Sequence, residues 1–436
     1  MSSSITPPQQ VLQQARSPAT APLTGQMAVR VYLCFALGYL ISYVFRTSNA
    51  VIAPYLRADL HLTDADLGLL SSAYFFSFAL MQLPLGIWLD KYGPRRLEAG
   101  LLCIAAAGAA VFAMSESLLG LWVGRAMVGI GVSACLMAAF TGFRMWYAPA
   151  IQGRLASLML VAGTAGALVA TVPVSFAITL VGWRGVFWIL CGMVLVAVIL
   201  ILFVLKEPER VNQRPKPKAA PVSAPGGGYK MIFTHPYFLR VLPMAVITVG
   251  VYAAIHTLWA GPWMTLVLGF DNTLVANVLF GFNLLMLSSH LGLSWLAPRL
   301  AVRSDKGGWS VHRLVWISAG SAIIIETVMV VFAAPWTWMV LILLSACMTI
   351  TILVQVNVAM SFPASFVGRA NSAFNFLVFV GSFLMQWSIG LMSDGFQSLE
   401  FTHANALRGA LAVCILLQIG VLVAYLLNKA EPEKHE

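Results

Sequence analysis

The sequence has few charged residues for its length. Asp, Glu, Lys and Arg make up 10% of its 436 residues, whereas hydrophobic residues make up 60% and the mean hydropathy is +0.85. A soluble domain typically has about a quarter charged residues, because its surface faces water. Most of this protein's surface must therefore face lipid, and we interpret the chain as an all-α integral membrane protein.

Paired cysteines and metal-binding spacings are also missing. The six cysteines all lie in apolar runs and none forms a CxxC pair, so neither a disulfide framework nor a zinc site is indicated. His235, His256, His290 and His312 show no HExxH or HxxxH spacing. We therefore predict no metal, no cofactor and no enzymatic activity.

Apolar runs of about 20 residues, the length that crosses a bilayer, recur along the chain. We predict twelve spans, near residues 28–50, 66–89, 97–115, 118–142, 154–180, 185–205, 240–267, 273–297, 311–333, 336–360, 370–393 and 405–428. They form two six-helix bundles with polar segments around them. The predicted units are a disordered tail (1–27), the first bundle (28–205), a basic linker (206–238), the second bundle (239–428) and a C-terminal tail (429–436).

The positive charge is unevenly distributed between the two sides of the predicted spans. Of the 26 Lys and Arg residues, only Arg57, Arg184 and Arg408 fall in the loops of one side, and Arg46 and Arg125 fall within spans. Loops rich in Lys and Arg stay in the cytoplasm. Both termini and the linker are thus predicted to be cytoplasmic. We expect the protein to be a monomer in the cell inner membrane. The net charge of +10 then reflects topology and not nucleic-acid binding.

The two predicted bundles resemble each other in sequence. Gln152–Ser157 (QGRLAS) opens the fifth span, and Val367–Ser372 (VGRANS) opens the eleventh. In transporters built from such repeats, the substrate site lies between the repeats near the middle of the bilayer.

A motif between the second and third spans points to a family. Residues 86–96 read GIWLDKYGPRR, which resembles the G-x-x-x-D-[RK]-x-G-[RP]-[RK]-[RK] loop of the major facilitator superfamily. The resemblance implies a major facilitator fold and a loop that latches the two halves in the outward-open state. A loop that only sets topology is the alternative. The implied gating residues are Gly86, Asp90, Lys91, Gly93, Arg95 and Arg96.

Arg46 is the sharpest candidate for a substrate ligand. An Arg within a span keeps its charge and needs an anion or a dipole. The segment 43–89 resembles the anion:cation symporter branch, in which a first-span Arg contacts a substrate carboxylate. Tyr43 and Asn49 share its helical face, and Tyr74 is a plausible neighbour on the second span. The alternatives are snorkelling to the interface and an internal structural pair.

Further candidates come from other spans. The symporter branch also has a functional Arg in span four, and the resemblance implies this role for Arg125. Other members of the superfamily have an Arg at this edge for packing, which is the alternative. In span seven, His256 lies 210 residues after Arg46, close to the 215-residue offset of the repeats, and is a candidate ligand or proton carrier. A histidine that only forms packing hydrogen bonds is the alternative. Gly261-Pro262 is expected to break this helix. Glu326, deep in span nine, is the other proton-coupling candidate. The remaining predicted substrate-binding residues are Trp259, Asn283, Gln355, Asn357 and Asn375.

Together these features predict a secondary active transporter that moves a small carboxylate-bearing anion by alternating access, with proton-coupled uptake. The symporter branch has an acidic residue in span four, and none lies between Arg125 and Phe143 here. Proton coupling would then use His256 or Glu326, and an uncoupled transporter or an exchanger is the alternative. A drug or metabolite efflux antiporter on the same fold is the alternative, although span five lacks a Gly-Pro centre. A membrane sensor or enzyme is a remote alternative.

Overall fold

The computed structural model describes residues 22–206, 228–305, 311–349, 354, 355, 358, 361–363 and 366–428. Every regular element in these ranges is a helix, so the predicted all-α class is confirmed. Ten of the described helices are long and apolar enough to cross a membrane. The count of twelve spans and the cytoplasmic position of the termini stay predictions.

The first half of the chain forms long helices that bend at glycines. α4 contains the predicted second and third spans as two helical segments that meet at Gly93, where the backbone leaves the helical conformation with a φ of 77°. Only glycine adopts this conformation readily, which explains the residue at this turn. The helices are α2 (Gly25–Thr47), α3 (Asn49–Leu60), α4 (Asp64–Met114), α5 (Leu118–Val132), α6 (Cys135–Trp146), η1 (Pro149–Ile151), α7 (Gln152–Val169) and α8 (Val172–Val204).

The second half begins with a short helix inside the predicted linker. Its elements are α10 (Gly228–Thr234), α11 (Pro236–Ala254), η2 (Ile255–Trp259), α12 (Ala260–Pro262), η3 (Trp263–Val267), α13 (Asn272–Asp305), α14 (Val311–Phe332), α15 (Thr337–Thr349), α17 (Val367–Ser398) and α18 (His403–Leu427). The predicted break at Gly261-Pro262 is wrong. The helix continues through this pair, and it is π-helical on both sides of it. The wider π turns accommodate the proline without ending the helix.

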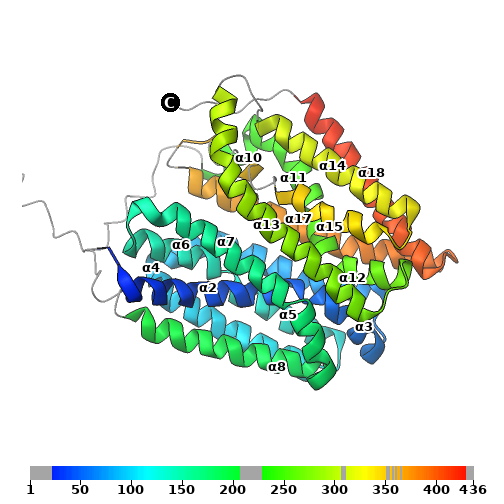
Figure 1. The fold of residues 1–436 in the computed structure, drawn as a ribbon, viewed down its shortest axis with the longest axis horizontal. Coiled ribbons are helices and arrows are strands. Elements are labelled where there is room, and N and C mark those ends of the chain that lie inside the picture. Colours follow the sequence, from blue (N-terminus) through cyan, green and yellow to red (C-terminus); the bar gives the residue numbers. More distant parts are fainter. Residues whose placement is uncertain are drawn as a thin grey trace, which may run out of the picture.

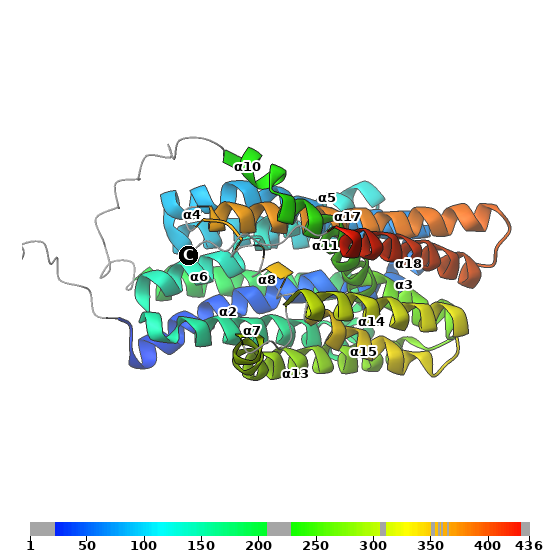
Figure 2. The same ribbon diagram turned by 90° about the horizontal axis from the view of Figure 1, so that it is seen from above.

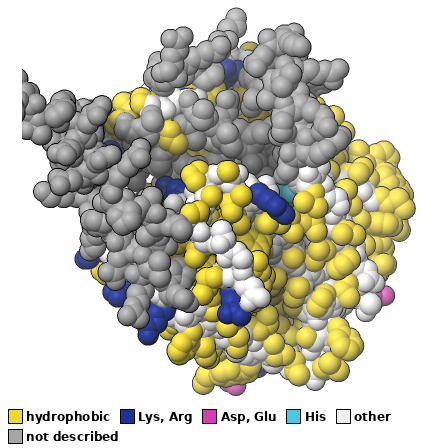
Figure 3. Space-filling view, turned by 60° about the vertical axis from the view of Figure 1, so that its left-hand side comes forward, with side chains coloured by type: hydrophobic (Ala, Val, Ile, Leu, Met, Phe, Trp, Pro, Cys, Tyr) yellow, Lys and Arg dark blue, Asp and Glu magenta, His cyan; other side chains and the backbone are white. Residues whose placement is uncertain are grey.

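The molecular surface is dominated by hydrophobic side chains. Phe203, Leu427 and Phe176 are 74%, 76% and 65% exposed. Figure 3 shows a broad hydrophobic surface, with Lys and Arg side chains gathered near the end that comes forward. Helices satisfy their own backbone hydrogen bonds, so such a surface is stable in lipid.

The two halves lie side by side along their length (Figures 1 and 2). α17 packs along α4, α13 packs along α7, and α3 packs against α12. α3, the first turn of α4 and the last turns of α17 define what we call the α3 end of the molecule. The inner end is the opposite one, where α2 begins (Figure 1).

At the α3 end, a polar network joins the two halves. The carboxylate of Asp394, on α17, accepts hydrogen bonds from the backbone N–H groups of Asp64 and Ala65, at 3.1 and 2.9 Å. These N–H groups belong to the first turn of α4 and have no partner within their own helix. An acid is favoured at this position because the N-terminal end of a helix carries partial positive charge.

The side chain of Asp64 is the centre of the same network. It is fully buried, and it pairs with Arg57 of its own half. Ser393 donates to its Oδ2 at 2.5 Å, and the Nε2 of His403 lies 2.9 Å from that oxygen. A carboxylate that is buried with this many partners avoids the cost of an unpaired charge.

Close backbone packing accompanies the network. A Cβ at Gly68 of α4 would lie 2.7 Å from the carbonyl oxygen of Gln386 of α17. Glycine is therefore required for this approach of the two helices. The α3 end is closed both by hydrogen bonds and by packing between the halves.

Candidate functional site

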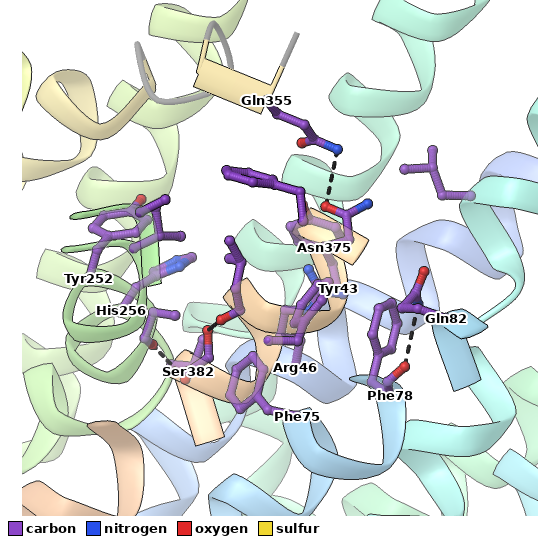
Figure 4. Close-up of a pocket in the computed structure, with 18 of the residues that line it drawn as sticks. Tyr43, Arg46, Phe75, Phe78, Gln82, Tyr252, His256, Gln355, Asn375 and Ser382 are labelled. Carbon is purple, nitrogen blue, oxygen red and sulfur yellow. Dashed lines mark hydrogen bonds between the residues drawn. The ribbon is translucent and has the colours of Figure 1, made fainter. Parts of the chain in front are cut away.

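A cavity of about 620 Å³ lies between the two halves. Its walls come from α2, α4, α5, α6 and α7 on one side and from α11, α13, α14 and α17 on the other. Figure 4 shows Arg46 and Tyr43 near the centre, with Tyr252 and His256 on a neighbouring helix. No described residue that lines the cavity is acidic. The cavity is concave, largely apolar and located between repeats, as binding sites of small molecules are.

Arg46 lies in the cavity wall with aromatic rings around it. Its guanidinium carbon is 4.8 Å from the ring centroid of Tyr43, 5.1 Å from that of Phe78 and 5.4 Å from that of Phe379. Its Nε donates to the Tyr74 hydroxyl at 3.4 Å. Ring faces stabilise a cation without neutralising it. The guanidinium thus keeps its positive charge and faces a cavity without carboxylates.

Five of the predicted substrate-binding residues line this one cavity, although they come from four helical segments. They are Tyr43, Arg46, His256, Gln355 and Asn375. Tyr74 stands directly behind Arg46 and contacts it through the hydrogen bond described above. Asn357 lies outside the described residues.

His256 is held by an amide and by stacked rings. Its Nε2 lies 2.9 Å from the Oδ1 of Asn283, whose amide nitrogen donates to the Leu279 carbonyl at 2.8 Å. The imidazole stacks on Tyr252 and Phe282, with centroids 5.7 and 5.0 Å away. Asn283 is 1% exposed and acts on the cavity only through the imidazole. An acceptor on Nε2 favours a hydrogen on that nitrogen and leaves Nδ1 as the second ring nitrogen to gain or lose a proton.

Gln355 and Asn375 contribute a second pair of polar side chains to the cavity wall. The Nε2 of Gln355 donates to the Oδ1 of Asn375 at 3.0 Å and to that of Asn371 at 2.8 Å (Figure 4). These interactions join the tenth predicted span to α17. They orient the two amide groups that a ligand would meet here.

Arg125 is placed away from the cavity. It is 0% exposed, it donates to the Phe45 carbonyl at 2.8 Å, and it donates to Asn49. Phe112 and Phe187 lie 4.9 and 5.1 Å from its guanidinium carbon. Arg125 and Asn49 therefore brace α2 inside the first half, and neither lines the cavity in this conformation.

Trp259 and Glu326 are also buried outside the cavity wall. The Nε1 of Trp259 donates to the Gln386 carbonyl at 3.1 Å, which ties η2 to α17. Gln418 of α18 donates to the carboxyl of Glu326 on α14. Glu326 thus lies between two helices of the second half and has no direct route to a bound substrate.

The gating motif lies at the inner end, and the contacts described for its residues stay within the first half. Asp90 is exposed and makes no hydrogen bond or ion pair within the described ranges. Arg95 donates to the Leu202 carbonyl of its own half at 3.1 Å. Lys91 lies over the ring of Tyr92, and Arg96 is exposed. A Cβ at Gly86 would meet no atom within 4 Å.

Several residues of interest were not anticipated from the sequence. Phe78 and Phe379 next to Arg46 look like ordinary lipid-facing aromatics in a helix, because no local pattern marks them. Glu98 falls near the start of a predicted span, but it is 0% exposed and neither carboxyl oxygen has a hydrogen-bond partner. A carboxyl buried in this way is stable only as the neutral acid. The cross-half role of Asp64 and Asp394 required the tertiary structure.

Solved structures of other proteins share this fold. A bacterial homologue of the human lysosomal transporter Spinster, described as inward-facing and unoccupied, superposes with a TM-score of 0.73, covering 93% of this chain and 98% of that one at 16% identity. The D-xylose–proton symporter has a TM-score of 0.73 over 94% of this chain and all of the other, at 14% identity. Identities this low establish the fold and not the substrate.

Curated relatives match a shorter part of the sequence. The probable sulfoacetate transporter SauU of Cupriavidus necator is 30% identical over 179 residues, which is 41% of each chain. The galacturonate transporter of Dickeya chrysanthemi is 26% identical over 40% of this chain and 50% of its own. The matched segments thus span half or less of these relatives.

The match to a family covers most of the chain. The family description for the Major Facilitator Superfamily matches residues 35–386, which include the second half of α2 with Arg46, the motif at 86–96 and most of α17. The family resemblance predicted from the motif is therefore confirmed, and the family indicates a transporter and not an enzyme. This multi-pass membrane protein belongs to the Major Facilitator Superfamily.

Proposed function

We propose that the protein is a secondary active transporter of the inner membrane that takes up a small organic anion by alternating access. The observation that carries the proposal is the placement of Arg46. It is a permanent cation in the wall of a central cavity, and no described acidic residue lines that cavity. A substrate carboxylate would supply the missing negative charge through a bidentate pair.

The conformation supports alternating access. The α3 end is closed by the Asp64–Asp394 network, whereas Asp90 of the gating motif, at the inner end, is exposed and makes no hydrogen bond or ion pair within the described ranges. With the predicted topology, in which the termini are cytoplasmic, this is the inward-facing state. The gating role of Asp90 then belongs to the opposite state, in which the inner end closes.

For coupling we propose a proton, with His256 as its carrier. His256 lines the same cavity as Arg46, so its protonation and substrate binding can influence each other. Glu326 is the second candidate, but it lies outside the wall and is held by Gln418. The names of the relatives, which include transporters of sulfoacetate and galacturonate, agree with an anionic substrate.

The test is thermal stabilisation of the purified protein by ligands. A ligand that binds the folded state raises the melting temperature, and the stabilisation grows with the logarithm of its concentration once that exceeds the dissociation constant. We expect small carboxylates to stabilise the wild type and Arg184→Ala, and to have no effect on Arg46→Ala. Arg184 is a matched control because it pairs with Asp59 outside the cavity.

Two results would contradict the proposal. If Arg46→Ala kept the carboxylate-induced shift, Arg46 would not be the ligand. If only lipophilic cations stabilised the protein, the efflux antiporter would replace the uptake transporter. The absence of acidic groups from the described cavity wall argues against that alternative, since a bound cation would lack a counter-charge.

A further inference from the structure

The permanent charge available to a ligand in the cavity is a single cation, since the imidazole of His256 in the same wall is positive only when it carries a proton. Among the described residues that line it, Arg46 is the sole Lys or Arg. The Nε of Arg46 is engaged by Tyr74, and its terminal nitrogens have no acceptor within the described ranges. Those two nitrogens match the two oxygens of one carboxylate. A dianion would bring a second negative charge without a Lys or Arg to pair with it.

Several hydroxyl and amide groups of the wall are committed to the protein, whereas the buried hydroxyl of Thr248 has no partner within the described residues. Thr257, Ser382 and Ser133 donate to carbonyls of their own helices at 2.7, 3.0 and 2.7 Å. Gln82 donates weakly to the Phe78 carbonyl at 3.4 Å (Figure 4). These four groups are not free to pair with a ligand, and each hydroxyl of a hydroxyl-rich ligand that lost water without a new partner would weaken binding.

The rest of the wall is aromatic and aliphatic. Phe78 of α4 and Phe379 of α17 approach each other across the two halves, with centroids 4.5 Å apart, and Phe75 stacks on Phe379 at 6.3 Å. All three rings line the cavity beside Arg46. Aromatic rings of this kind favour stacked or edge contacts with a ligand ring. Met137 and Met286, also in the wall, adapt to varied ligand shapes.

We infer that the substrate is a monocarboxylate with an aromatic or otherwise apolar body. The carboxylate pairs with Arg46, and the body lies between Phe78, Phe379 and the methionines. This inference rests on the proposed function and narrows it. It disfavours hydroxyl-rich sugar acids and phosphate esters, although proteins that carry such solutes are among the relatives of this chain.

The experiment compares four probes on the purified full-length protein: phenylacetate, galacturonate, glucose 6-phosphate and the neutral phenylacetamide. Binding is measured by titration of the thermal shift, and transport by counterflow in proteoliposomes. We expect phenylacetate to bind at least about tenfold more tightly than galacturonate, and phenylacetamide not to bind. Phe379→Leu, which keeps an apolar side chain, should weaken phenylacetate binding by about tenfold.

The matched control is Phe383→Leu. Phe383 lies one turn further along α17, contacts Phe76 and Trp387, and does not line the cavity. It should leave phenylacetate binding unchanged.

The outcomes separate the inference from the proposed function. If galacturonate or glucose 6-phosphate binds more tightly than phenylacetate and loses binding in Arg46→Ala, the narrower inference is wrong while anion transport stands. If no anion binds, or if binding is insensitive to Arg46, the proposed function itself fails. Equal effects of Phe379→Leu and Phe383→Leu would overturn the role of the aromatic wall.

Discussion

Substituting Asp394 by Asn tests whether the network at the α3 end holds the two halves together. The carboxylate accepts the N–H groups of Asp64 and Ala65 across the interface between α17 and α4. A hydrogen bond to a charged group contributes about 1.5–3 kcal/mol and one to a neutral group about 0.5–1.5 kcal/mol. Loss of a negative charge at a helix N-terminus adds about 0.3–1 kcal/mol.

Because Asn retains one neutral acceptor and Asp394 is partly exposed, we expect the substitution to reduce the interaction free energy between the two halves by about 1–2 kcal/mol. This energy stabilises only the conformation in which the α3 end is closed. The equilibrium should therefore shift toward opening of this end by roughly 5- to 30-fold.

The assay is alkylation of a cysteine placed at Ala50. Ala50 is 1% exposed, and its carbonyl packs against Gly261 of the other half, away from Asp394. A water-soluble maleimide reaches this site only when the halves separate at the α3 end. The alkylation rate, followed by peptide mass spectrometry, should rise 5- to 30-fold in Asp394→Asn in line with the estimate above.

Asp271→Asn serves as the matched control. Asp271 caps the start of α13 by accepting a hydrogen bond from the Leu274 N–H at 2.8 Å. Its substitution therefore removes a similar charge and a similar helix cap, but within one half of the molecule. Its alkylation rate should equal that of the unsubstituted reporter. If Asp394→Asn reacted no faster than Asp271→Asn, the network would not contribute to closure and the reasoning would be refuted.

Three further predictions concern other parts of the molecule. Gly68→Ala should also speed alkylation of the Ala50 reporter, because its Cβ would meet the Gln386 carbonyl, whereas Gly100→Ala on the same helix has nothing within 4 Å and should not. Arg125→Gln should lower the melting temperature, since it leaves buried acceptors without a donor at about 1–3 kcal/mol each, yet the remaining folded protein should bind carboxylates with unchanged affinity. His256→Gln should abolish substrate accumulation driven by a pH gradient but preserve counterflow, and Glu326→Gln should preserve both activities. If Glu326→Gln instead abolished accumulation and His256→Gln did not, the coupling role would belong to Glu326.

Composition and periodicity predicted the membrane class and most helix positions. The boundaries depend on local chemistry that is visible in the chain, such as Gly93 at the turn between two predicted spans. The prediction at Gly261-Pro262 was wrong because a proline lowers helix stability locally, while the neighbouring turns can widen to accommodate it. A single sequence contains no signal for that compensation.

For the site, the sequence identified Arg46 because a charge within an apolar span is costly and needs a partner. The same reasoning singled out Arg125, but it did not distinguish a residue that lines the cavity from one that stabilises the packing of helices. The distinction depends on which way each side chain faces. Only the packing of α2 against α5 and α8 shows that Arg125 points at Phe45 and Asn49.

The amino-acid sequence alone determined the membrane environment, the helical class and the family, because these depend on apolar run lengths and on a contiguous motif. The tertiary structure decided which residues share the cavity and which close the α3 end. Phe78 and Phe379 are 301 residues apart in the sequence, and Asp64 and Asp394 are 330 residues apart. Contacts between such distant segments arise from the packing of α4 against α17, and helical periodicity within either segment carries no information about its partner.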